Sequence, residues 1–175
     1  MEHMKLTELI SQEKIEKRVN EIGRQLSEKF KDKDVVAVCI LKGSFMFYAD
    51  LIRALDIDLA CDFFGVSSYQ GNSSSGEVKL TLDLSKPVHD KHVILIEDIV
   101  DTGLTMQYLQ KALLARNPKS LTTTTLLLKP SALRCKVKLD VVGFEISDQF
   151  VVGYGLDYQG HYRNLPYIAQ VQDIN

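Results

Sequence analysis

Apolar and polar positions follow regular patterns along most of this chain. The first pattern places apolar side chains at steps of three and four residues, at Ile15, Val19, Ile22, Leu26 and Phe30. This spacing predicts an amphipathic helix from about Ser11 to Phe30, with Ser11 as its N-cap. The next segment, Val35 to Leu41, is almost continuously apolar and predicts a strand that is buried on both faces. The turn Lys42-Gly43-Ser44 then leads into a second predicted helix, Phe45 to Leu55, with Ser44 at the cap position.

Further strands are expected near residues 59–69, 77–82, 93–96, 121–128, 141–146, 150–154 and 167–171, and a helical pattern begins at Leu104. Strands and helices alternate between Val35 and Leu128, which predicts a doubly wound, mainly parallel α/β sheet flanked by helices. The Ser- and Gly-rich patch Gln70 to Gly76 is too short for a domain linker and is expected at a hairpin tip, as a surface connection or a lid. We therefore expect one domain over residues 1–175.

Three carboxylates follow the apolar run Val93 to Ile96, at Glu97, Asp98 and Asp101, and a Thr-Gly-Leu-Thr turn comes next. Ligands of open α/β sheets bind at the carboxyl ends of the strands, and helix amino termini bind phosphate through free N–H groups. The threonine hydroxyls add donors, and Gly103 lets an anion approach the backbone closely. Carboxylates beside a phosphate site are explained if a hydroxylated sugar or a divalent cation lies between them. The segment thus predicts a phosphorylated sugar bound with magnesium.

Composition narrows the function classes. The 175 residues carry a formal net charge of −2, with 45% hydrophobic and 25% charged residues, as in an ordinary soluble enzyme. The sequence has no Lys/Arg-rich run, so nucleic acid is not expected as a partner. The amino terminus is polar and the apolar runs are short, so we expect no membrane association and a cytoplasmic location. The cysteines do not have zinc spacing, and we expect Cys39 and Cys61 to pack in the core.

The segment Val93 to Met106 closely resembles the phosphoribosyl-pyrophosphate (PRPP) motif of the type I phosphoribosyltransferases. The turn at Lys42-Gly43, the pair Ser68-Tyr69 and the run Val-Val-Gly-Tyr-Gly-Leu-Asp-Tyr from Val151 extend the likeness to the hypoxanthine-guanine branch of that family. The resemblance covers about residues 35–169. It implies the type I phosphoribosyltransferase fold, with a core at about residues 35–145, a hood from about 1–12 and 147–175, and a mobile lid at about 68–79.

The resemblance also implies an activity and partners. A purine salvage enzyme of this branch transfers the phosphoribosyl group of PRPP to a 6-oxopurine base, giving IMP or GMP and pyrophosphate. The cofactor is Mg²⁺, and a homo-oligomer, either a dimer or a tetramer, is expected. The peptide bond before Lys42 is expected to be cis.

Roles are implied for the positions that match. Glu97 and Asp98 meet the ribose hydroxyls, and Asp101 is the general base near purine N7. The 5′-phosphate is bound by Asp101, Thr102, Gly103, Leu104 and Thr105, and the pyrophosphate by Lys42, Gly43 and Arg163. The purine is bound by Lys129, Phe150, Val151 and Asp157, and the lid starts at Ser68 and Tyr69. Magnesium is bound by Asp157, while Glu97 and Asp98 either bind the metal as well or bind only the ribose. Leu104 replaces a basic residue of some relatives, and the serine content of the lid is unusual.

The sequence leaves alternatives open. A PRPP-sensing regulatory protein can share the fold, and another transferase could prefer xanthine or a pyrimidine. The ammonium group of Lys129 only donates hydrogen bonds, so it favours a carbonyl at C6 and disfavours adenine. It does not separate hypoxanthine, guanine and xanthine.

Overall fold

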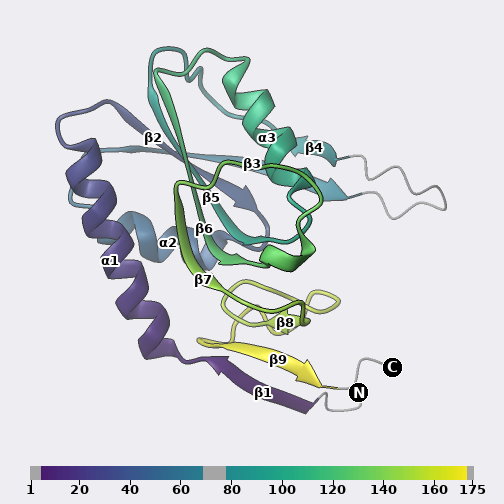
Figure 1. The fold of residues 1–175 in the computed structure, drawn as a ribbon. Coiled ribbons are helices and arrows are strands. Elements are labelled where there is room, and N and C mark those ends of the chain that lie inside the picture. Colours follow the sequence, from purple (N-terminus) through teal and green to yellow (C-terminus); the bar gives the residue numbers. More distant parts are fainter. Residues whose placement is uncertain (1–4, 69–77, 173–175) are drawn as a thin grey trace.

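The computed structural model describes residues 5–68 and 78–172, which form two sheets and three long helices (Figure 1). The elements follow the order β1 (Lys5–Ile10), α1 (Gln12–Phe30), β2 (Val35–Leu41), α2 (Phe45–Ala54), β3 (Ala60–Ser68), β4 (Val78–Leu82), β5 (His92–Val100), α3 (Leu104–Leu114), β6 (Ser120–Leu128), the 3₁₀ turn Pro130–Ala132, β7 (Val141–Glu145), β8 (Val151–Val152) and β9 (Ile168–Gln172).

The larger sheet has six strands in the order β4-β3-β2-β5-β6-β7. Its strands run parallel from β3 to β7, and only the edge strand β4 is antiparallel to its neighbour. This is the mainly parallel sheet that the alternation of strands and helices predicts. Because β2, β5 and β6 are adjacent and parallel, their carboxyl ends lie at the same edge of the sheet.

Alternate residues of β2 show how helices cover both faces of this sheet. Ala37 and Cys39 pack in one buried cluster with α1 and α2, whereas Val36 and Val38 pack in the other with α3. Coverage on both faces explains why β2 is continuously apolar. The expected N-cap of α1 is confirmed, since the Ser11 hydroxyl accepts a hydrogen bond from the Lys14 N–H at 3.4 Å.

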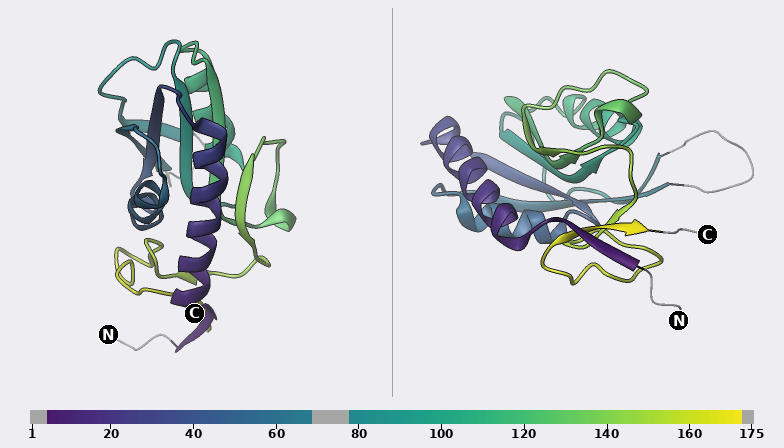
Figure 2. Two further views of the ribbon diagram at one scale, coloured as in Figure 1. Left: turned by 90° about the vertical axis from the view of Figure 1, so that its left-hand side faces the viewer. Right: turned by 60° about the horizontal axis from the view of Figure 1, so that its bottom comes forward.

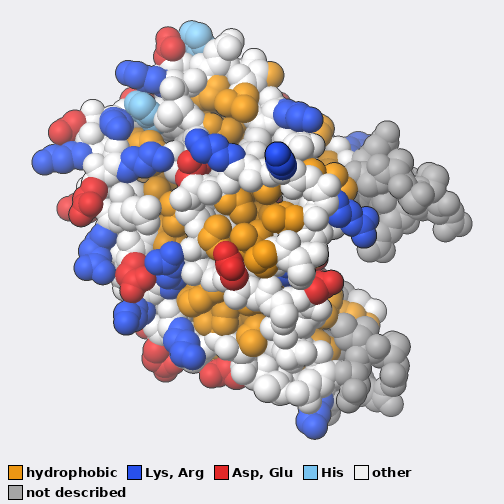
Figure 3. All heavy atoms as spheres, in the orientation of Figure 1, with side chains coloured by type: hydrophobic (Ala, Val, Ile, Leu, Met, Phe, Trp, Pro, Cys, Tyr) orange, Lys and Arg blue, Asp and Glu red, His pale blue; other side chains and the backbone are white. Residues whose placement is uncertain are grey.

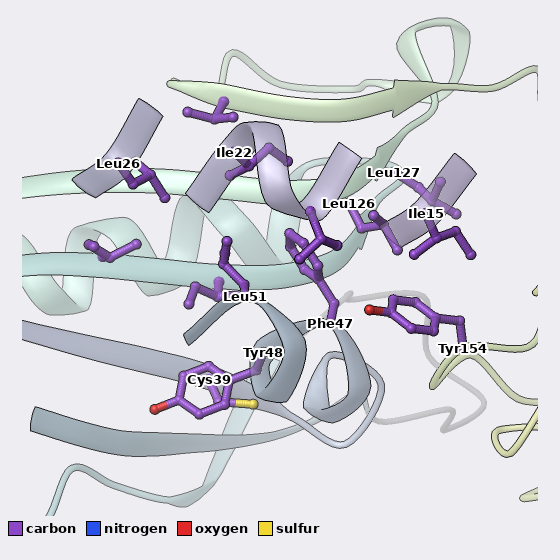
Figure 4. Close-up of a cluster of buried hydrophobic side chains, with 14 of the residues drawn as sticks. Ile15, Ile22, Leu26, Cys39, Phe47, Tyr48, Leu51, Leu126, Leu127 and Tyr154 are labelled. Carbon is purple, nitrogen blue, oxygen red and sulfur yellow. The ribbon is translucent and has the colours of Figure 1, made fainter. Parts of the chain in front are cut away.

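The smaller sheet joins the two ends of the chain. Strand β9 lies between β1 and β8 and is antiparallel to both, so the amino-terminal strand and the last strand are side by side (Figure 2). Tyr154, just after β8, is buried in the cluster formed with α1 and α2 (Figure 4). Its hydroxyl donates a hydrogen bond to Asp50 Oδ2 of α2 at 2.6 Å. This bond ties the loop after β8 to the larger sheet's helical layer.

Several local expectations were wrong. The sequence predicted no strand at β1, and the strand expected at residues 150–154 is limited to Val151–Val152 because Gly153 and Tyr154 have φ angles of +98° and +50°. Cys61 is exposed rather than buried, whereas Cys39 lies in the core as expected. Ser44 does hold the N-cap position of α2, as expected, but its hydroxyl donates to the Ile40 carbonyl and makes no capping hydrogen bond.

The surface is mixed in charge. Basic and acidic side chains are interspersed on the face seen in Figure 3, in keeping with the formal net charge of −2. Within residues 5–68 and 78–172, no helix has the length and apolar character needed to cross a membrane.

Candidate active site

A cavity of about 310 Å³ opens at the carboxyl ends of the parallel strands. Eight of its lining residues were predicted from the sequence, and Ile99 and Leu156 complete it. The eight are Gly43, Asp98, Asp101, Lys129, Phe150, Val151, Asp157 and Arg163. The structure therefore brings the expected purine side and the expected pyrophosphate side of the site together around one cavity.

Glu97 and Asp98 lie within β5, which continues to Val100 instead of ending at Ile96. Both side chains are buried, and Asp98 lines the cavity whereas Glu97 does not. Burial raises the pKa of both carboxyls, and the neighbouring charge of Asp98 raises that of Glu97 further. Arg163 acts in the opposite direction on the pKa of Asp98. A buried acid pair of this kind favours ligands that bring hydroxyl donors or positive charge.

The turn after β2 packs directly against Asp98. The peptide bond between Leu41 and Lys42 is cis, as the resemblance implied. A Cβ atom on Gly43 would lie only 1.7 Å from Asp98 Oδ2, so glycine is required where the turn meets the carboxylate. On the other side, a Cβ on Gly155 would lie 2.0 Å from the Gly43 carbonyl oxygen. The turn is held between a strand of the large sheet and the loop after β8.

The expected 5′-phosphate loop comes between β5 and α3. Gly103 takes the cap position of α3 with φ at +83°, a conformation that favours glycine. The Thr102 Oγ1 accepts a hydrogen bond from the Leu104 N–H at 3.4 Å, and Thr102 and Thr105 are half-buried. The amino terminus of α3 therefore stands beside Asp101, where its free N–H groups suit a phosphate. Residues 102–105 do not line the cavity itself.

Lys129 follows β6 and is buried between two carboxylates. Its Nζ lies 3.4 Å from Asp101 Oδ2 and 3.3 Å from Asp148 Oδ1. Phe150 is partly exposed beside the same cavity, and its ring meets that of Tyr158 edge-on with centroids 5.8 Å apart. An apolar ring, a buried ammonium and a nearby carboxylate suit a flat heterocycle that has both an acceptor and an acidic N–H.

Arg163 and Asp157, which also line the cavity, form an ion pair. The guanidinium contacts Asp157 Oδ1 at 2.6 Å and donates a hydrogen bond to the Gly155 carbonyl at 2.6 Å. The second oxygen of Asp157 accepts the Gly160 N–H at 2.7 Å. Arg163 keeps further donors that can bind an anion.

The residues present fit a magnesium ion that is held mainly by substrate. The described residues contain no group of three acidic, thiol or imidazole side chains that could hold a metal. Mg²⁺ commonly takes one or two carboxylates and completes its shell with substrate phosphates and water. Asp98 and Asp157 both line the cavity and supply that number.

Sequence reasoning gave no role to Asp148 or Tyr158, although both lie in the segment that carries the purine motif. The sequence signal that could have found Asp148 is its acidic side chain two positions before Phe150.

Lys42 is exposed and does not line the cavity. Ser68 ends β3, and Tyr69 together with most of the expected lid lies outside the described residues.

Comparisons with known proteins point to one family. Residues 5–159 match the family model of the phosphoribosyl transferase domain. The chain is 50% identical over 163 residues to the hypoxanthine-guanine phosphoribosyltransferase of Bacillus subtilis (strain 168), covering 92% of this chain and 90% of that protein. It is 45% identical over 166 residues to the hypoxanthine phosphoribosyltransferase of Escherichia coli (strain K12), covering 93% of each.

Solved structures give the same result. A hypoxanthine phosphoribosyltransferase from Staphylococcus aureus superposes with a TM-score of 0.91 at 44% identity, over 97% of this chain and 92% of that one. The enzyme from Trypanosoma cruzi, solved with its product IMP, gives a TM-score of 0.90 at 38% identity, over 98% and 96% of the two chains.

Proposed function

Because this chain belongs to the hypoxanthine-guanine branch of the phosphoribosyl transferase family, we propose that it transfers the phosphoribosyl group of PRPP to hypoxanthine or guanine. The products are IMP or GMP and pyrophosphate, which makes the protein a purine salvage enzyme. A regulatory protein that only senses PRPP is not favoured, since the relatives named above are transferases.

The observation that carries this proposal is the cavity in which two sets of groups meet. Lys129, Phe150 and Val151 line its purine side, and Gly43 and Arg163 line its pyrophosphate side. Asp101 lines the same cavity and contacts Lys129. A base and an activated ribose can therefore lie next to each other.

In the proposed reaction, N9 of the base attacks C1 of the ribose as pyrophosphate leaves. The transition state develops oxocarbenium character, as in other glycosyl transfers. Asp101 accepts the proton from purine N7, and Lys129 donates a hydrogen bond to O6. Phe150 stacks on the base, and the backbone of Val151 contacts its edge. These groups orient the base and hold its proton.

The remaining groups bind PRPP. Residues 101–105 and the amino terminus of α3 bind the 5′-phosphate, and Glu97 and Asp98 bind the ribose hydroxyls. Arg163 and the backbone of the Lys42-Gly43 turn stabilise the negative charge that collects on pyrophosphate. Asp157, together with Asp98 or Glu97, would hold Mg²⁺, and the bound ion would neutralise charge on that leaving group. A lid that begins at Ser68 and Tyr69 is proposed to exclude water.

Ultraviolet assays with hypoxanthine, guanine, xanthine and adenine, each with PRPP and magnesium, test the proposal. We expect turnover of hypoxanthine and guanine, little or none of adenine, and no reaction when PRPP is left out. Failure to turn over any of the four bases would refute the transferase, whereas adenine as the best substrate would refute the role of Lys129. A best rate with xanthine would support the alternative specificity.

The role of Asp101 has its own test. Asp101→Ala should lower kcat far more than it weakens PRPP binding, because the carboxylate accepts a proton only during transfer. Equal losses in both would assign Asp101 to binding.

The dimer or tetramer and the cytoplasmic location stay predictions. Light scattering of the purified protein tests the oligomeric state.

A further inference from the structure

Asp148 is a carboxylate with no role in the reaction described so far, and it contacts the buried lysine of the purine side. It lies between β7 and β8, whereas Asp101 follows β5, so separate segments bring the two acids to Lys129. The side chain of Lys129 is 8% exposed, and that of Asp148 is 68% exposed. The ammonium is thus buried at one end of an ion pair whose other end faces water.

A lysine ammonium has three N–H donors and no acceptor. Two of them face carboxylates, at 3.4 Å to Asp101 and 3.3 Å to Asp148. Since Lys129 also lines the cavity beside Phe150, the third donor can point toward a bound base. We infer that Asp148 is a positioning residue that holds the Lys129 ammonium with one N–H directed at O6 of the purine. This inference rests on the proposed 6-oxopurine transfer.

The charge balance during transfer gives Asp148 a separate task from Asp101. The N7 proton moves to the Asp101 carboxylate while the N9 lone pair bonds to C1 of the ribose. The C1–O bond breaks, and its electron pair leaves with pyrophosphate. Asp101 is neutral at that point and attracts the ammonium less. Asp148 takes no part in the proton transfer, so it still offers Lys129 a counter-charge.

Exposed ion pairs commonly contribute little, which is the simplest alternative for Asp148. The burial of Lys129 argues against it here, because a buried ammonium that loses its partners is strongly disfavoured. Without Asp148, the ammonium would be drawn toward Asp101 in the free site. Binding of O6 would then compete with that remaining ion pair, and the affinity for the base would fall.

The test compares Asp148→Asn and Asp148→Glu with Asp34→Asn as a matched control. Asp34 is 66% exposed and pairs with Lys91 at 2.6 Å, just before β2 at the opposite ends of the strands. KM is measured for hypoxanthine at saturating PRPP, and for PRPP at saturating hypoxanthine. We expect Asp148→Asn to raise the KM for hypoxanthine about tenfold, which corresponds to about 1.4 kcal/mol, and to change the KM for PRPP less than twofold. Asp148→Glu should restore most of the loss, and Asp34→Asn should match the wild type.

A second measurement tests whether Asp148 acts through Lys129. In a Lys129→Met background, Asp148→Asn should cause no further rise in the KM for hypoxanthine. Three results would overturn this inference but leave the proposed function standing. They are a wild-type KM for Asp148→Asn, an equal rise in both KM values, and an undiminished effect in the Lys129→Met background. A wild-type protein that turns over none of the bases would overturn the proposed function and the inference with it.

Discussion

Replacing Gly43 by alanine tests whether the turn after β2 sets the position of Asp98, the carboxylate that we propose binds ribose. The added Cβ would lie 1.7 Å from Asp98 Oδ2 and 2.7 Å from its Cγ. The turn cannot simply move away, because the Gly43 carbonyl is so close to Gly155 that a Cβ there would lie 2.0 Å from it. The carboxylate of Asp98 therefore has to move.

The size of that movement follows from the contact distance. A Cβ atom essentially never comes within 3.0 Å of another group, so Oδ2 must retreat by about 1.3 Å. Asp98 has little room, since it is buried and its Oδ1 accepts the Ile99 N–H at 2.8 Å. A misplacement of about 1 Å in an active site can cost on the order of 100-fold in rate. We expect kcat/KM for PRPP to fall about 100-fold in Gly43→Ala, equivalent to about 2.7 kcal/mol.

Gly23→Ala is the matched control. Its Cβ would lie 2.6 Å from the Ala54 carbonyl oxygen, where α1 crosses α2 away from the cavity. This variant should lose about 1–2 kcal/mol in urea unfolding by overpacking and keep the wild-type KM for PRPP. Both variants are assayed with PRPP varied at saturating hypoxanthine. An unchanged kcat/KM in Gly43→Ala, or the same kinetic loss in Gly23→Ala, would refute the reasoning.

Three further predictions concern buried and exposed polar groups. Thr124→Val should stabilise the protein by about 1 kcal/mol in urea unfolding, because its buried hydroxyl has no partner among the described residues. Thr125→Val should not, since that hydroxyl donates to a carbonyl at 2.9 Å. Burial acts to raise the pKa of Asp62, but hydrogen bonds from residues 63, 85 and 86 leave it below its ordinary value of 3.8. Asp62→Asn should therefore cost about 2 kcal/mol at neutral pH, and this difference should shrink as the pH falls through 3.8 and below. A thiol reagent should modify exposed Cys61 quickly and Cys39 only on unfolding, since burial raises the pKa of the Cys39 thiol to about 11.

Different outcomes would contradict each of these expectations. Equal stabilisation by both threonine substitutions would mean that valine simply suits the strand. A difference between Asp62→Asn and the wild type that stays constant down to pH 3 would show that the charge of the carboxylate is not what stabilises the turn. Rapid modification of Cys39 in the folded protein would mean that β2 opens readily.

The centre of the large sheet was predictable because β2, β5 and β6 are covered on both faces. The apolar run from Val35 to Leu41 coincides with β2, and the stripe along residues 15–30 faces the core as expected. Strand β1 was not predictable in this way. Its partner β9 lies at the far end of the chain, and most of its residues are exposed or half-buried, so its local pattern is weak. Cys61 lies in an apolar segment, yet the structure leaves its side chain in solvent.

The candidate site was predictable where residues follow strand ends, because parallel strands bring those ends to one edge. Gly43, Asp101 and Lys129 follow three different strands and line one cavity. The ion pairs of the site were not predictable. The ion pair between Lys129 and Asp148 depends on the course of the connection from β7 to β8. No local sequence pattern predicts that course.

Strand β5 includes Glu97 and Asp98 but ends before Asp101, so these carboxylates differ in how firmly the backbone holds them. Glu97 pairs with Thr125 and Ile99 with Leu127 in the parallel ladder, so the backbone on both sides of Asp98 is fixed by β6. Asp101 comes after the strand, and its side chain is 49% exposed. A fixed position suits Asp98 in its proposed role as a ribose-binding group, whereas the proposed role of Asp101 as a proton acceptor needs a side chain that can move. The three acids lie within five residues of one another in the sequence. Because β5 ends at Val100, Glu97 and Asp98 have a fixed backbone, whereas Asp101 lies outside the strand.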